Sequence, residues 1–159
     1  MHIRIVAVGK IKEKFINDGI KEYLKRLGSY AKVEIIEVTD EKIPDHASPG
    51  ELEKVKQKEA ERLSRYLKEG TYLIVLDISG KNLSSEELAG TIKDLGNKGK
   101  SDVTILVGGS VGLHSLLINQ ASLRLSFGRM TYPHQLMRVI LLEQIYRSFK
   151  IIRGEPYHK

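Results

Sequence analysis

Residues 102–113 read DVTILVGGSVGL, an apolar stretch that runs directly into a loop with three glycines. Four of the five residues in 103–107 are apolar, without the alternation of a half-exposed strand. Such a run is typical of a strand buried on both faces, as the inner strands of a parallel sheet are. Because glycine has no Cβ, the backbone after the strand can approach a ligand closely. The pattern predicts a buried strand over 102–109 followed by a binding loop.

Similar strand patterns alternate with helical patterns along the whole chain. Short runs of apolar and β-branched residues are separated by segments in which apolar residues recur at helical spacing. This alternation predicts a parallel sheet with helices on both faces, and no repeat or long linker interrupts it. We therefore expect one α/β domain over residues 1–159, with strands at 2–9, 32–38, 71–78, 102–109 and 123–127 and helices at 13–28, 51–67, 84–96 and 133–150.

The composition narrows the class of protein. The absence of cysteine excludes disulfides, zinc–thiolate sites and a cysteine nucleophile. The first ten residues meet charge too early for a signal peptide, and no apolar run is long enough to span a membrane, so we expect a cytoplasmic protein. The net charge of +6 favours an anionic partner. Basic residues outnumber acidic ones seven to three in 10–32 and six to two in 129–159.

Three expected strands end in segments suited to ligand binding: LDISGK (76–81), VGGSVGL (107–113) and SFGRMTYPH (126–134). Ligands of open parallel sheets bind beyond the carboxyl ends of the strands, so the three segments predict one shared binding site. A dinucleotide site of the Rossmann type is excluded, because the glycines are spaced G-G-x-x-G late in the chain and no acidic residue follows between 103 and 142. The P-loop pattern for nucleoside triphosphates is also absent.

The last expected helix is apolar around almost its whole circumference. Leu136, Val139 and Ile140 share a face with Glu143 and Arg147, and other apolar residues cover most of the remainder. A helix of this kind is buried on both sides, which predicts a subunit interface, most simply that of a two-fold homodimer. Glu143 and Arg147 are four residues apart and are expected to pair. The pair either fixes the interface or acts directly at the active site.

LD-SGK in 76–81, VGGSVGL in 107–113 and TYPHQLMRVILLEQIYRSFKIIRGEPYHK in 131–159 together resemble the bacterial ribosomal RNA large subunit methyltransferase H family, small members of the SPOUT class. The resemblance covers the whole chain and is densest from residue 73 to the end. It implies S-adenosylmethionine as methyl donor and N3 of a pseudouridine in helix 69 of 23S ribosomal RNA as acceptor, in the assembled ribosome. It further implies a parallel sheet with a C-terminal deep trefoil knot and an active homodimer.

The same resemblance assigns the cofactor pocket. It implies that Leu76 and Gly108 close two sides of the adenosine pocket and that one loop supplies the remaining wall and the backbone hydrogen bonds. Within that loop Arg129, Met130 and Tyr132 depart from the commoner forms in the family, which leaves their individual side-chain roles open. The residues of the loop are Phe127, Gly128, Arg129, Met130, Thr131 and Tyr132.

The last helix and the chain end contain the candidate residues for removing the N3 proton of the pseudouridine and for binding the RNA. The N3 proton of a uracil-type ring must leave before or during attack, and His158 is a candidate to accept it, because histidine is the usual acid–base side chain near neutral pH. Tyr157 can stack on a base or hydrogen-bond to it. Glu143 could serve as base only if Arg147 does not hold it, and proton loss to water is the alternative to any protein base. The expected phosphate-binding residues are Arg138, Arg147, Arg153 and Lys159.

Two other functions compete with this one. A non-catalytic RNA-binding module would explain the charge, but it gives no reason for three glycine-rich or polar loops at one sheet edge. A methyltransferase of the same class that acts on transfer RNA is disfavoured by the short chain and its Pro-Tyr-His end. No metal site is expected, because His2, His46 and His114 lack the spacing of metal ligands.

Overall fold

A parallel sheet of five strands organises the computed structural model, which describes residues 1–158. The strand order is β2-β1-β4-β3-β5, and every neighbouring pair is parallel. The strands are β1 (His2–Val8), β2 (Lys32–Val38), β3 (Tyr72–Asn82), β4 (Asp102–Val107) and β5 (Leu123–Ser126). The helices are α1 (Lys14–Leu27), α2 (Pro49–Ser64), α3 (Ser85–Asn97), α4 (Ser115–Gln120) and α5 (His134–Arg153). The predicted α/β class with a helix-flanked parallel sheet is confirmed.

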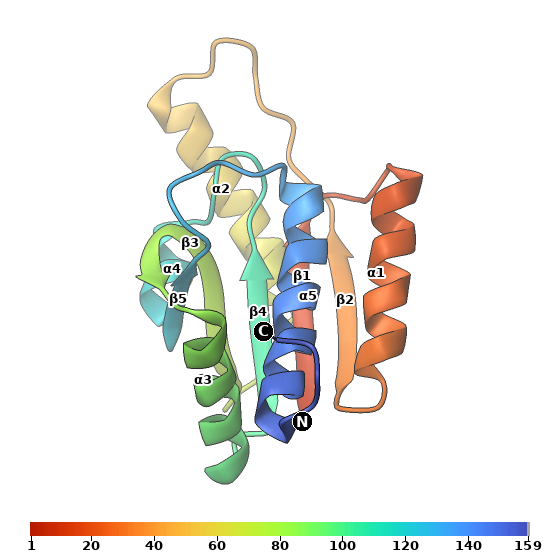
Figure 1. The fold of residues 1–159 in the computed structure, drawn as a ribbon. Coiled ribbons are helices and arrows are strands. Elements are labelled where there is room, and N and C mark those ends of the chain that lie inside the picture. Colours follow the sequence, from red (N-terminus) through yellow and green to blue (C-terminus); the bar gives the residue numbers. More distant parts are fainter. Residues whose placement is uncertain (159) are drawn as a thin grey trace.

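The helices form a layer on each face of the sheet (Figure 1). On one face α5 lies between α1 and α3 and packs against both. On the other face α2 and α4 cover the sheet. Alternate residues of β1 serve the two cores, with Ile3 and Ile5 facing α5 and Val6 and Val8 facing α2. This double burial explains why the inner strands are continuously apolar.

The starts of α2 and α3 follow local capping signals. Ser48 and Ser84 each form a capping box, with Glu51 and Glu87 respectively, before α2 and α3. The cap at Ser48 places the start of α2 at Pro49, two residues before the predicted start. Helix α4 was not predicted, because six residues with a single buried side chain, Leu117, give no helical periodicity.

Strand β3 extends four residues beyond its predicted end and bends around β5. Leu76 and Lys81 both pair with Leu125, so the segment between them bulges out of the regular ladder. A Cβ on Gly80 would lie 2.7 Å from the backbone carbonyl of Arg124, so only glycine fits at this crossing. The Arg124 guanidinium also donates to Asp77 Oδ2 at 2.6 and 2.9 Å. Backbone contact and ion pair together fix the end of β3 on β5.

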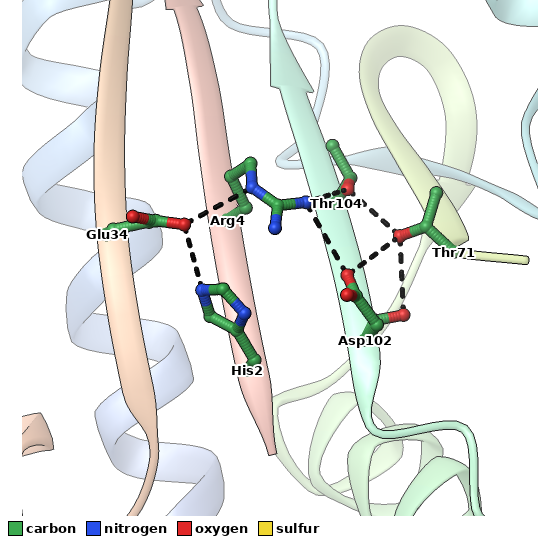
Figure 2. A network of polar contacts seen from close by, with 6 residues as sticks. All are labelled: His2, Arg4, Glu34, Thr71, Asp102 and Thr104. Carbon is green, nitrogen blue, oxygen red and sulfur yellow. Dashed lines mark hydrogen bonds and ion pairs between the residues drawn. The ribbon is translucent and has the colours of Figure 1, made fainter. Parts of the chain in front are cut away.

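A polar network holds the strands together at their amino ends (Figure 2). The buried side chain of Arg4 donates to Glu34 Oε1 at 3.2 Å and to Thr104 Oγ1 at 3.3 Å. Its guanidinium also lies 3.5 Å from Asp102 Oδ1, and Glu34 is shared with His2 at 2.8 Å. The network joins β1, β2 and β4 at the end of the sheet opposite the glycine loops.

Within residues 1–158, no helix is long and apolar enough to cross a membrane.

Candidate active site

A cavity of about 410 Å³ lies at the carboxyl ends of β3, β4 and β5. All three segments singled out in the sequence contribute to its wall, so the expected meeting of strand ends at one sheet edge is confirmed. The loop between β5 and α5 and the first turns of α5 close the remaining side. The lining includes Leu76–Ile78, Val107–Ser110, Gly112, Leu113, Phe127, Gly128, Met130–His134 and Met137.

Two glycines give this cavity an exposed backbone surface. Gly112 has φ +80° and Gly128 has φ +105°, values that side-chain-bearing residues rarely adopt. No atom lies within 4 Å of the place where a Cβ would stand on either residue. The cavity therefore offers unobstructed peptide groups to a ligand, as expected for recognition by backbone hydrogen bonds.

The charge of the wall suits a ligand without phosphate groups. Among the described residues that line the cavity there is no Lys or Arg, the side chains that usually hold phosphates. Asp77 is the one acidic residue among the described residues of the wall, and it already accepts from Arg124. Burial, and then the nearby charge of Arg138, lower the pKa of His134, which favours a neutral imidazole at this wall.

The structure brings together seven of the eight predicted cofactor residues. Leu76, Gly108, Phe127, Gly128, Met130, Thr131 and Tyr132 all line the cavity. Arg129 does not line it, and its side chain is exposed.

The C-terminal segment folds back onto α5. Tyr157 donates its hydroxyl to Glu143 Oε1 at 3.1 Å, and its ring lies 4.7 Å from the Arg147 guanidinium carbon and 5.0 Å from the Tyr146 ring. Arg147 donates to the same Glu143 oxygen at 2.7 and 3.0 Å, while Gln144 donates to Oε2 at 2.7 Å. Glu143 is thus held by four donor groups, and the condition for its acting as a base is not met. Burial raises the pKa of Tyr157, which stays a phenol donor.

His158 is held by two partners of opposite charge. Its Nδ1 lies 3.3 Å from Arg147 and its Nε2 lies 2.8 Å from Glu86 Oε1 in the first turn of α3. Because a guanidinium only donates, Nδ1 accepts and Nε2 carries the proton that it shares with Glu86. The backbone N–H of Glu86, and then His158, lower the pKa of Glu86 to about 2.

Comparison with known proteins identifies the family. The family model described as "Predicted SPOUT methyltransferase" matches residues 1–158. Over all 159 residues and the full length of each relative, the chain is 58% identical to "Ribosomal RNA large subunit methyltransferase H" of Carboxydothermus hydrogenoformans and 57% identical to that of Acetivibrio thermocellus. It is 54% identical over the same span to that of Enterococcus faecalis. The chain belongs to this family.

A member of the methyltransferase H family is an enzyme, and SPOUT methyltransferases use S-adenosylmethionine as methyl donor. Three features of the cavity fit S-adenosylmethionine. Its volume is about 410 Å³, and its backbone is open at Gly112 and Gly128. The described residues of its wall also include no Lys or Arg, whose charge would repel the positively charged sulfonium. Among residues 1–158, no group of three or more His, Asp or Glu is placed to hold a metal ion.

The predicted RNA-binding residues of this methyltransferase H family member differ in how exposed their side chains are. Arg153 is half exposed and lies 4.4 Å from the Tyr30 ring, and Arg147 is partly exposed beside Tyr157. Arg138 is fully buried, donating to the carbonyl oxygens of Val8 and Gly9 at 2.7 and 2.8 Å, so it cannot reach a phosphate. The number of basic residues in a segment does not indicate which of them are buried. Lys159 lies outside the described residues.

Proposed function

We propose that this enzyme methylates N3 of a pseudouridine in helix 69 of 23S ribosomal RNA, with the assembled ribosome as substrate. The proposal is carried by one observation above all: three strand-end loops build a single glycine-rich cavity in a chain that matches ribosomal RNA large subunit methyltransferases H over its full length. The relatives' name specifies ribosomal RNA of the large subunit, and the nucleotide and its stage of assembly are our proposal.

We assign S-adenosylmethionine to the 410 Å³ cavity. When bound, this molecule supplies an electrophilic methyl group on its sulfonium sulfur. Leu76 and Gly108 would hold the adenosine from two sides, and the backbone of 127–132 would supply hydrogen bonds. Arg129 takes no part in this wall, in keeping with its exposed position.

The C-terminal segment would act on the acceptor base. The N3 proton of the base must leave, and among Tyr157, His158 and Glu143 only the imidazole suits this task. Glu143 is saturated by donors, and Tyr157 is a phenol. His158 accepts a proton on Nδ1 only after it separates from Arg147, so we infer that RNA binding draws Arg147 toward a phosphate and frees Nδ1. Proton loss to water remains the alternative.

The remaining cations would contact the RNA backbone. Arg147, Arg153 and Lys159 are the proposed phosphate ligands at the chain end, together with the basic stretch 10–32 on and around α1. Arg138 is left out because its guanidinium is buried against β1.

We further propose that the active form is a homodimer with a knotted C-terminal segment, acting in the cytoplasm. Leu136, Val139 and Ile140 stay partly exposed on α5, and Phe15 on neighbouring α1 is 68% exposed, which supports an interface there. The bend of β3 around β5 at Gly80 supports a knot, because it lets one segment of chain pass close over another.

The proposal is tested by incubating the enzyme with S-adenosylmethionine labelled in its methyl group and with assembled ribosomes, separate subunits, protein-free ribosomal RNA or transfer RNA. We expect label in the large-subunit RNA of assembled ribosomes and little in the other three substrates. Equal labelling of protein-free RNA would overturn the assignment to assembled ribosomes, and label in transfer RNA alone would overturn the substrate class.

A further inference from the structure

A second cavity, of about 390 Å³, lies beside the proposed cofactor cavity. The two share Leu125, Phe127 and Gly128 as a common wall. Across this second cavity stand Ser85 at the start of α3 and Gln144 in the middle of α5. These two residues directly precede Glu86 and follow Glu143, which hold His158 and Tyr157. The second cavity thus adjoins the cofactor cavity, and the sequence neighbours of two of its lining residues anchor the C-terminal segment.

The side-chain amide of Gln144 is fixed in one orientation. Its Nε2 lies 2.7 Å from Glu143 Oε2, and the Ser85 hydroxyl lies 2.7 Å from its Oε1. An ionised carboxylate only accepts hydrogen bonds, so the amide nitrogen must face Glu143 and the carbonyl must face Ser85. A carbonyl oxygen has two lone pairs, and Ser85 uses one. Gln144 Oε1 therefore keeps one lone pair free to accept a hydrogen bond at this wall, and Nε2 keeps one N–H that Glu143 does not use.

An acceptor at this place suits one feature of pseudouridine. When its N3 points at the methyl donor, its C2 and C4 carbonyls flank N3, and N1–H is the second ring donor. In uridine, joined to its ribose through N1, the equivalent ring position carries a C–H group. A buried acceptor rejects a ligand that lacks the matching N–H, because the acceptor is then left unpaired.

We propose that the second cavity is the pocket for the acceptor base and that Gln144 Oε1 accepts the N1–H of pseudouridine. Gln144 is then the residue that distinguishes pseudouridine from uridine, and Ser85 and Glu143 are positioning residues that hold its amide. The inference rests on the proposed function, since it names the base determinant of the same reaction. It also explains why Glu143 is saturated: one carboxylate orients both the base-reading amide and Tyr157.

The test compares two ribosome preparations, one with pseudouridine and one with uridine at the target nucleotide. kcat/KM is measured on both for the wild type and for Gln144→Leu, which keeps the approximate volume and removes the acceptor. Gln57→Leu is the matched control, because Gln57 is exposed on α2 at the opposite face of the sheet. We expect Gln144→Leu to reduce the pseudouridine-to-uridine ratio of kcat/KM by about 10-fold or more, and Gln57→Leu to leave it unchanged.

A second variant tests the inference independently, in case Gln144→Leu does not fold correctly. Ser85→Ala leaves Gln144 in place but removes one of its two anchors, so it should reduce the same ratio by a smaller factor. Thermal unfolding and S-adenosylmethionine affinity are measured for each variant. A ratio that stays at the wild-type value in both Gln144→Leu and Ser85→Ala overturns the inference. Failure of the wild type to methylate either ribosome would instead overturn the proposed function.

Discussion

Glu59 is a buried carboxylic acid directly behind the glycine loop of the proposed cofactor site. Its side chain is 4% exposed, and its Oε1 accepts the backbone N–H of Glu41 at 3.1 Å. Within residues 1–158 its Oε2 is buried without a hydrogen-bond partner, and a Cβ on Gly109 would stand 3.3 Å from it. Burial raises the pKa of this carboxyl. This burial was not predictable, because Glu59 lies among many other charged residues of α2.

The raised pKa predicts a pH-dependent stability difference between wild type and Glu59→Gln. The unfolded chain releases this proton near pH 4.5, whereas the folded chain retains it to higher pH. The stabilisation is therefore full below pH 4.5 and is lost as the pH rises through the folded pKa. Urea unfolding between pH 4.5 and 8 should show the wild type losing free energy of unfolding relative to Glu59→Gln. A constant difference would refute this, and Glu61→Gln, exposed on the same helix, controls for the lost charge.

Other predictions for individual residues succeeded or failed according to whether the sequence reveals the burial and contacts of the side chain. The three segments of the cavity wall were predictable because glycine and apolar patterns at strand ends reflect backbone geometry, whereas the individual cofactor residues were implied by the family resemblance. Arg138 was misplaced among the phosphate ligands because its sequence neighbours do not reveal that it is fully buried beneath the end of β1. Gln144 was missed for the opposite reason: it is one polar residue in an apolar helix, and its two anchors lie on different elements.

At the scale of elements, the bend of β3 around β5 is the feature on which the cavity wall depends. We expect Gly80→Ala to lower the free energy of unfolding by about 1–3 kcal/mol, because its Cβ must displace the backbone of Arg124. Gly90→Ala in α3 is the control: no atom lies within 4 Å of the added Cβ, and alanine favours the helix by about 1 kcal/mol. Denaturant unfolding of both variants measures the effect. Equal stability of the two would show that the crossing tolerates a side chain.

The C-terminal segment is an element whose loss should separate binding from catalysis. Removal of residues 157–159 deletes Tyr157 and His158 but none of the residues that line the cofactor cavity. S-adenosylmethionine affinity by calorimetry should stay within about threefold of the wild type, while methyl transfer to ribosomes should fall at least about 100-fold, the lower range for a lost acid–base group. Normal methylation by the truncated enzyme would exclude the segment from the site.

The order and type of the longer elements followed from sequence because inner strands and amphipathic helices have distinct periodicities. All five strands and four of the five helices were predicted. The extension of β3 to Asn82 was not, since its last residues pair irregularly and are mostly exposed. Tertiary contact with β5 holds them in place.

At the scale of the whole molecule, the partly exposed apolar face of α5 predicts association. Sedimentation equilibrium should give a mass twice the 18.0 kDa of one chain, because burying this face against a second copy removes apolar surface from water. A species of 18.0 kDa at all accessible concentrations would contradict the proposed dimer.

In the proposed reaction, this chain transfers a methyl group to N3 of a pseudouridine in helix 69. The most direct measurement is mass spectrometric mapping of ribosomal RNA after assembled ribosomes that lack the modification are incubated with the enzyme and S-adenosylmethionine carrying a deuterated methyl group. We expect one labelled methyl group, on N3 of that pseudouridine. Label on another nucleotide, on a ribose oxygen or on a ring carbon would contradict it.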